Sequence, residues 1–287
     1  MTRLSPDKVS WRERLRRELL LQVARVANHR EFAVPALEVT WHDIRIPSLP
    51  PDLEGVMIAQ VSDLHVGPGP WRPLRWREAA AAVERAQPDI IVNTGDFLQW
   101  EPPPSRARSV FERFLAGGGD LEEPPHTFAI LGNHDYHAGH ESVRELRCEL
   151  EDEGVRVLTN QTVGVSIHGT GISITGLTTH SHGFDGAISG LLQAPRPRIV
   201  LIHEPDVAAC IPARAADLVL AGHTHGGQIT VPGLRPFIVR RFSGSRYVEG
   251  WYRVNDIPMY VNRGLGCTGY PLRFRARPEV SFFRLTH

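Results

Sequence analysis

The sequence predicts an α/β protein in which two β-sheets pack face to face and helices cover their outer faces. Three observations carry this prediction. In the first half, apolar segments of strand length alternate with helical patterns, which is the order of parallel β-α-β units. The second half is richer in short apolar strands. Polar clusters follow several strands directly, at the edge where ligands gather in parallel sheets.

In the first half, three predicted strands each end in a polar cluster. The strands are expected at 56–61, 89–93 and 127–131, and the clusters after them are Ser62-Asp63-Leu64-His65, Gly95-Asp96 and Gly132-Asn133-His134-Asp135. Apolar residues at three- and four-residue steps predict helices at 74–86, 107–116 and 141–153. Because parallel strands end at one edge, we expect the three clusters to lie together.

The second half repeats this arrangement twice. A strand at 198–202 ends at His203, and a strand at 217–221 ends at Gly222-His223-Thr224-His225. A hairpin is expected from 163–167 and 171–177, and further strands at 229–231, 250–254, 259–261 and 280–285.

The N-terminal segment has a different character. Residues 7–29 place apolar side chains on one helical stripe and arginines on the remaining face. Such a helix either lies on an anionic membrane surface or packs on the rest of the protein. Residues 35–48 alternate as one or two strands, and a Pro-rich stretch follows. We therefore predict an arm of helix and strand at 1–53 and a catalytic domain at 54–287.

Composition limits the class of partner and compartment. Thirty-two basic and 32 acidic residues give a formal net charge of zero, so charge provides no basis for nucleic acid as an obligate partner. The three cysteines form no Cys-x-x-Cys pair, which favours reduced, mostly buried thiols and a cytoplasmic location. The sequence contains no apolar stretch of about 18 residues, so no transmembrane helix is predicted.

The polar clusters have the composition of a metal site. They supply Asp, His and Asn but no Cys, and imidazole with carboxylate suits Mn²⁺, Fe²⁺ and Zn²⁺. At a strand end, residues two apart point to the same side, so Asp63 and His65 can reach one ion together. Glycines beside each cluster remove side-chain bulk where the backbone turns close to the site.

Taken in order, the clusters resemble the motifs of calcineurin-like metallophosphoesterases. The resemblance is closer still to the bacterial YkuE-like branch, whose extended last motif matches 222–228 and whose His-x-Pro-Asp segment matches 203–206. Its tail resembles 262–266, 271–274 and 278–279. The match covers about residues 55–287.

This resemblance implies a four-layer αββα sandwich of two mixed β-sheets, the metallo-dependent phosphatase fold, with the N-terminal arm added. It implies two divalent ions about 3.5–4 Å apart that share a hydroxide, which attacks phosphorus in line. One ion would be held by Asp63, His65 and His225 and the other by Asn133, His203 and His223, with Asp96 bridging both. The chain would then hydrolyse a phosphodiester, phosphomonoester or pyrophosphate.

The resemblance gives His134 a catalytic role without metal binding. It would contact the phosphate and protonate the leaving oxygen, a step that contributes about 10²–10⁴-fold, and Asp63 would help to orient it. Many relatives carry a carboxylate three residues after the bridging Asp96, where this chain has Gln99. We therefore expect Gln99 to leave metal binding intact but to alter the orientation of His134.

Other polar residues allow two interpretations. Four histidines either line the substrate cleft or face solvent: His137, His140, His180 and His182. Arg263 and Arg273 either bind a phosphate group or form surface ion pairs.

Two function classes are consistent with the motifs. The favoured one is a metal-dependent phosphoesterase, and the alternative is a non-catalytic metal-binding scaffold of the same fold. Because no expected ligand is missing, the sequence favours the enzyme. Some relatives are linked to lipid-linked diphosphates such as a UDP-diacylglucosamine, which the basic arm would suit at the inner face of a membrane. Soluble phosphodiesters fit the motifs equally well, and the oligomeric state is left open.

Overall fold

The computed structural model describes residues 35–67, 75–99, 125–137, 139–179, 183–230, 235–269 and 272–287. The helices predicted at 7–29 and 107–116, and the residues His180 and His182, lie outside these ranges. None of the helices within them is long and apolar enough to cross a bilayer.

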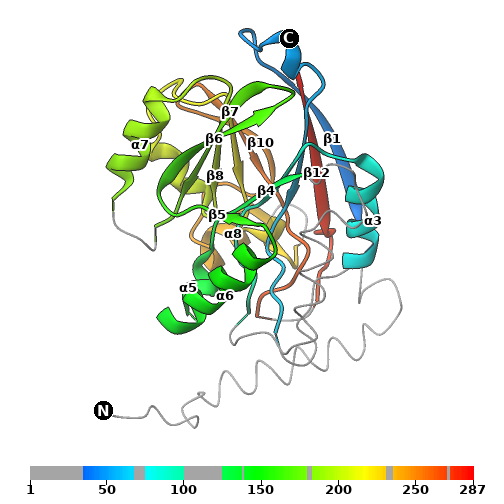
Figure 1. Ribbon diagram of the computed structural model, residues 1–287. Helices are drawn as coiled ribbons and strands as arrows, with labels where there is room; N and C mark the ends of the chain where they lie inside the picture. The colour runs from blue at the N-terminus through cyan, green and yellow to red at the C-terminus, as the bar shows by residue number, and fades with distance from the viewer. Residues whose placement is uncertain are drawn as a thin grey trace, which may run out of the picture.

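Two six-stranded mixed sheets form the centre of the molecule (Figure 1). The first has the order β1 (Glu38–Arg45), β12 (Glu279–Thr286), β2 (Met57–Val61), β3 (Ile90–Asn93), β4 (His126–Ala129) and β5 (Arg156–Val157). The second has the order β10 (Gly250–Val254), β11 (Ile257–Val261), β9 (Leu218–Ala221), β8 (Arg198–Ile202), β7 (Thr170–Leu177) and β6 (Gln161–Ile167).

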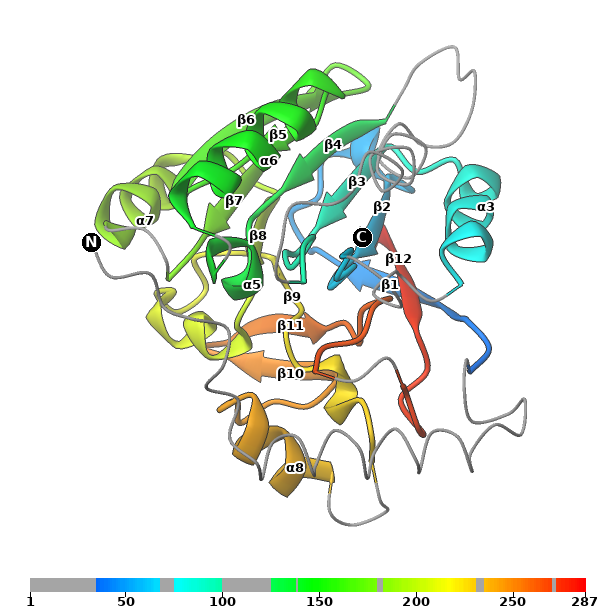
Figure 2. The ribbon, with the colours of Figure 1, turned by 90° about the horizontal axis from the view of Figure 1, so that it is seen from below.

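Helices cover the outer faces of both sheets. The α-helices are α3 (Trp76–Ala86), α5 (Asn133–His137), α6 (His140–Asp152), α7 (Phe184–Gln193) and α8 (Arg235–Phe242). Short 3-10 helices are η1 (Pro51–Leu53), η2 (Pro205–Cys210) and η3 (His225–Gly227). In Figure 2, α3 and α7 lie on opposite sides of the two sheets.

Alternation along the strands separates the layers of the core. On β3, Ile90 and Val92 face the cluster between the sheets, whereas Ile91 faces the cluster that includes side chains of α3 and α6. A third cluster joins α7 to the outer face of β8, β9 and β11. This period-two pattern is what a strand buried on both faces requires. The predicted αββα sandwich of two mixed sheets is confirmed.

β1 lies in the first sheet and pairs in parallel with β12 from Glu38 to Arg45. The sequence pattern placed this segment in an N-terminal arm. In the structure, β1 is instead the edge strand of the sheet that carries three of the polar clusters. Its side chains also contact the second sheet, since the Trp251 indole Nε1–H donates to His42 Nδ1 (3.3 Å). A truncated protein that keeps this sheet whole must therefore retain the chain from residue 38 onward.

Parallel pairing brings the polar clusters together. β2, β3 and β4 run parallel, so the residues that follow them leave the first sheet at one edge. β8 and β9 run parallel in the second sheet, and Gly222 N–H donates to the His203 carbonyl oxygen (3.1 Å) just beyond their ends. The topology thus places all five polar clusters at one end of the sandwich.

Two sequence expectations are wrong. Of the strand predicted at 229–231, residue 231 lies outside the described ranges, and the described part forms only a single bridge between Ile229 and Phe274, directly after the turn that follows η3. The cysteines are free, as expected, but only Cys267 is buried, whereas Cys148 and Cys210 are exposed. Cys148 lies on α6 and Cys210 at the end of η2, so neither reaches the core.

Candidate metal centre

The loops that carry the predicted ligands have an unusual backbone. Five of the seven predicted ligands adopt positive φ: Asp63 (52°), His65 (48°), Asp96 (57°), His223 (74°) and His225 (52°). For residues with a Cβ atom, this conformation is disfavoured by about 1–2 kcal/mol each. Strained conformations of this kind persist where the surrounding structure fixes them, and they concentrate at functional sites.

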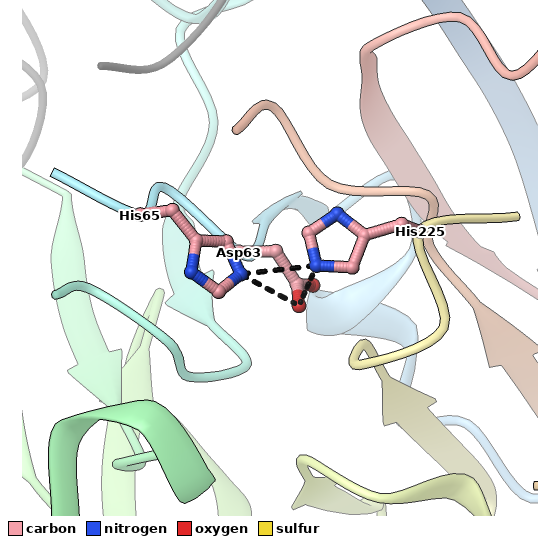
Figure 3. A group of neighbouring side chains, drawn as sticks. All are labelled: Asp63, His65 and His225. Carbon is pink, nitrogen blue, oxygen red and sulfur yellow. Dashed lines mark hydrogen bonds and ion pairs between the residues drawn. The ribbon is translucent and has the colours of Figure 1, made fainter. Parts of the chain in front are cut away.

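The first cluster consists of Asp63, His65 and His225, whose side chains converge in Figure 3. His225 Nε2 lies 3.0 Å from His65 Nε2 and 3.4 Å from Asp63 Oδ1. All three residues are buried. Two imidazoles and one carboxylate at these separations can share one divalent cation.

The second cluster gathers around His203. Its Nε2 lies 3.1 Å from Asn133 Oδ1, 3.3 Å from His223 Nδ1 and 3.2 Å from Asp96 Oδ2. Asp96 Oδ2 is also 3.5 Å from His65 Nε2 in the first cluster. One carboxylate oxygen of Asp96 therefore lies between the two clusters.

Main-chain carbonyls orient the histidines of the second cluster. The His203 Nδ1–H donates to the Thr94 carbonyl oxygen (2.7 Å), and the His223 Nε2–H donates to the Ser243 carbonyl oxygen (3.1 Å). Because a carbonyl only accepts, the proton of each neutral ring is held away from the cluster. The remaining ring nitrogen of each is directed inward with its lone pair, as metal ligation requires.

Burial controls the charge of the cluster. It lowers the pKa of His65 to about 3 and that of His225 well below its ordinary value, so both rings are neutral near pH 7. Burial also acts on His203, but the Asp96 carboxylate outweighs it and raises the pKa of His203 well above its ordinary value. A divalent cation at Asp96 would compete with that proton.

A directed chain of hydrogen bonds holds Asp63 from behind. The Gln60 amide donates to Thr94 Oγ1 (3.1 Å), the Thr94 hydroxyl to Ser62 Oγ (2.7 Å), and the Ser62 hydroxyl to Asp63 Oδ2. All four residues are fully buried. The only sequence signal for this chain of hydrogen bonds is the position of Ser62 and Thr94 beside the motifs.

Asp135, the last residue of the third cluster, joins two of the loops. Its carboxylate accepts from the main-chain N–H groups of Asp96 (3.0 Å), Leu98 (2.8 Å) and Gly132 (2.9 Å). Burial and the charge of Asp96 raise the pKa of Asp135 to about 7, while the Leu98 and Gly132 donors oppose that shift. Asp135 belongs to the third motif, but no sequence pattern indicated this role for it.

His134 lies beside the first cluster, with its ring centroid 4.8 Å from that of His65. Its main-chain N–H donates to Asp96 Oδ1 (2.9 Å), and its Nδ1–H donates to the Gln99 carbonyl oxygen (3.1 Å). The group that holds the ring is thus the main chain of Gln99 rather than its side chain. Among the described residues, both polar atoms of the buried Gln99 amide lack a hydrogen-bond partner.

Both tail arginines have partners within the protein. Arg273 is fully buried and donates to the carbonyl oxygens of Gly266 and Arg263 (both 2.7 Å), and its Nη2 lies 3.0 Å from His225 Nδ1. Arg263 pairs with Glu279 (2.9 Å) and Glu38 (3.2 Å). Arg273 is thus engaged by main-chain and His225 atoms, and the contacts of Arg263 are those of the ion-pair interpretation.

Of the other predicted histidines, His137 and His140 are exposed. The His137 ring lies 5.5 Å from the His134 ring, centroid to centroid, which puts His137 at the margin of the site. His140 is the first residue of α6.

The model of the calcineurin-like phosphoesterase family matches residues 56–227, which include every polar cluster described above. The chain belongs to this family. This calcineurin-like phosphoesterase is therefore a metal-dependent phosphoester hydrolase. It is 33% identical over 255 residues to the uncharacterized metallophosphoesterase YkuE of Bacillus subtilis, covering 87% of this chain and 85% of that one.

Two further relatives support the same branch. The metallophosphoesterase YkoQ of Bacillus subtilis is 30% identical, with 79% of this chain and 83% of that one covered. The phosphodiesterase YaeI of Escherichia coli is 32% identical, with 72% and 74% covered. The predicted membership of the YkuE-like branch of calcineurin-like phosphoesterases is confirmed.

Proposed function

We propose that this calcineurin-like phosphoesterase holds two divalent cations, of Mn²⁺, Fe²⁺ or Zn²⁺, and hydrolyses a phosphodiester, phosphomonoester or pyrophosphate. One cation would be held by Asp63, His65 and His225, the other by Asn133, His203 and His223, and both by Asp96. The observation that carries the proposal is the position of Asp96 Oδ2, 3.5 Å from His65 Nε2 and 3.2 Å from His203 Nε2. A carboxylate oxygen between two sets of imidazole, carboxylate and amide groups suits a bridging ligand.

Two cations held there would neutralise charge on the phosphoryl oxygens and provide hydroxide near neutral pH. The chain contributes the geometry around them. Ser62 and the main chain of His223 hold the Asp63 carboxylate, while Thr94 and Ser243 fix the rings of the second cluster. His134, held at Nδ1 by Gln99, would give its Nε2 proton to the leaving oxygen.

The test combines metal content with hydrolysis. We expect the wild-type protein to contain two metal ions per chain by mass spectrometry and to hydrolyse bis-p-nitrophenyl phosphate with added Mn²⁺. Asp96→Ala should lose the second ion and fall to the rate of chelated protein. The matched control is Asp185→Asn, an exposed carboxylate on α7, which should match the wild type in both measurements.

The non-catalytic scaffold makes the opposite prediction. It requires two bound ions with no hydrolysis of phosphodiesters, phosphomonoesters or pyrophosphates under Mn²⁺, Zn²⁺ or Fe²⁺. That result would refute the enzymatic part of the proposal. A single ion per wild-type chain would refute the bridging role of Asp96.

A lipid-linked substrate is the second candidate, and α8 favours it. Phe237 and Phe242 on this helix are 69% and 66% exposed, and Arg240 and Arg241 beside them are exposed as well. Directly after the helix, the Ser243 carbonyl accepts the hydrogen bond from His223. Exposed aromatic and cationic side chains next to the metal centre suit an anionic lipid surface.

Co-sedimentation with vesicles tests this candidate. Full-length protein should pellet with anionic phosphatidylglycerol vesicles, and Phe237→Ser with Phe242→Ser should abolish most of that binding. The basic N-terminal helix predicted at 7–29 is tested separately by deleting residues 1–34, which keeps β1 intact. Leu192→Ser, at an exposed apolar residue of α7, is the control. Equal pelleting by all proteins would exclude both surfaces as membrane contacts.

A further inference from the structure

The loop after β11 is bound to the backbone of the first metal-binding segment. Leu265 N–H donates to the Ser62 carbonyl oxygen (3.0 Å), and Gly266 N–H donates to the Asp63 carbonyl oxygen (2.6 Å). A Cβ atom on Gly266 would overlap the carbonyl of Leu64. The loop therefore approaches the Asp63 segment closely, and it carries Thr268 into the site in a fixed register.

Gln228 fixes the position of Thr268. The Gln228 side chain makes two hydrogen bonds to the main chain of that residue: its Nε2 donates to the Thr268 carbonyl oxygen (2.8 Å), and its Oε1 accepts from the Thr268 N–H (2.7 Å). Gln228 stands three residues after His225 and is 9% exposed. This two-point contact immobilises the backbone of Thr268 and leaves its hydroxyl for another partner.

The partner of that hydroxyl is His134. Thr268 Oγ1 lies 3.3 Å from His134 Nε2, while His134 Nδ1 lies 3.1 Å from the Gln99 carbonyl oxygen. Since a carbonyl only accepts, Nδ1 carries a proton. Nε2 then accepts from the Thr268 hydroxyl when the ring is neutral and donates when the ring is protonated. The imidazole is thus held at both nitrogens.

We propose that Thr268 is a positioning residue for His134, and that its hydroxyl, fixed by Gln228, holds Nε2 where the leaving oxygen is protonated. The inference rests on the proposed function, in which His134 supplies that proton. As hydroxide bonds to phosphorus, the P–O bond to the leaving group breaks and its electron pair stays on the leaving oxygen. That oxygen takes the proton from Nε2. The Thr268 hydroxyl orients the ring before this transfer, and the leaving oxygen then takes its place as the acceptor of the Nε2–H.

Leaving groups of different basicity provide the test. A phenolate leaving group needs protonation, whereas p-nitrophenolate leaves with little help. We expect Thr268→Val to lower kcat for a phenyl phosphodiester about tenfold, the effect of about one buried hydrogen bond, and to change kcat for the p-nitrophenyl ester less than about twofold. Thr268→Ser, which keeps the hydroxyl, should restore most of the phenyl rate. KM should be unchanged in both variants.

A purely structural role would reduce both substrates by the same factor, and that result would overturn the inference. No change with either substrate would overturn it as well. Thr170→Val is the control for the loss of a hydroxyl elsewhere. Thr170 lies on the β6–β7 hairpin, and its hydroxyl donates to the Asp52 carboxylate.

His134→Ala separates this inference from the proposed function. If His134→Ala shows no greater loss with phenyl than with p-nitrophenyl esters, the proposed role of His134 is wrong. If His134→Ala discriminates between the esters and Thr268→Val does not, only the role of Thr268 is wrong.

Discussion

Removing the hydroxyl of Thr94 tests the hydrogen-bond chain behind Asp63. The direction of this chain is fixed at both ends. The Gln60 Nε2 also bonds the Ala221 carbonyl oxygen, so this atom is the donor, and the Asp63 carboxylate at the other end only accepts. Thr94→Val keeps the shape of the side chain and breaks the two of the three bonds that involve the Thr94 hydroxyl, those to Gln60 and Ser62. The main-chain contact between Thr94 and His203 is unaffected, since it uses the carbonyl oxygen.

The magnitude follows from the partners that remain. Gln60 keeps its hydrogen bond to the Ala221 carbonyl oxygen (3.0 Å), whereas Ser62 loses its donor and keeps only its own bond to Asp63. Two buried neutral hydrogen bonds at about 0.5–1.5 kcal/mol each give a loss of about 1–3 kcal/mol in the free energy of unfolding. Weaker support of a metal-binding carboxylate should lower metal affinity about 10–100-fold.

Urea titration gives the free energy of unfolding, and calorimetric titration with Mn²⁺ gives the affinity. Thr175→Val is the matched control, because Thr175 is buried in the second sheet and bonds Thr162 (2.9 Å) away from the metal centre. It should lose stability and keep metal affinity. If Thr94→Val unfolds within about 0.5 kcal/mol of the wild type, or binds Mn²⁺ as Thr175→Val does, the chain does not support Asp63.

Three further outcomes are expected. Gly132→Ala places a Cβ atom over Asp96 Oδ1, so Mn²⁺ affinity by calorimetry should fall about 10–100-fold; unchanged affinity would show that the loop can shift. Burial would raise the pKa of Glu279, but Arg263 lowers it below its ordinary value, so its ionised form stabilises the protein above about pH 5 and this contribution disappears as the pH falls through the folded-state pKa. The loss of unfolding free energy in Glu279→Gln should therefore be larger at pH 7 than below about pH 4, and a constant difference across that range would contradict this assignment. Chelation should lower the melting temperature by about 5–10 °C at metal concentrations near 100 Kd, whereas chelating Asp96→Ala should change it little.

Much of the fold could be predicted from local pattern. The strand expected at 198–202 is β8, and the helix expected at 141–153 is α6 to within a residue at each end. β8 is a short, continuous apolar run, and α6 buries Leu146 and Leu150 four residues apart. Both patterns can be recognised in the sequence. The strand expected at 229–231 rested on only two apolar residues, Ile229 and Val231, on either side of Thr230, too short a pattern to define a strand.

The arrangement of the sheets needed the tertiary structure. Residues 35–48 alternate as a strand should, but sequence pattern does not identify a strand's partner. β1 pairs with β12, about 240 residues later in the chain. A boundary near residue 54 followed from the Pro-rich stretch, whereas the pairing ties the preceding strand to the first sheet.

The sequence by itself determined which side chains gather at the candidate metal centre. Each predicted ligand follows a strand directly or within a few residues, and parallel strands bring their ends to one edge, so local order was sufficient. Only the tertiary structure decided what holds those side chains in place. Gln99 orients His134 through its main-chain carbonyl, a group that every residue has and no sequence pattern marks. Thr268 and Arg273 reach His134 and His225 across 134 and 48 residues of chain, distances over which only the packed fold determines contact.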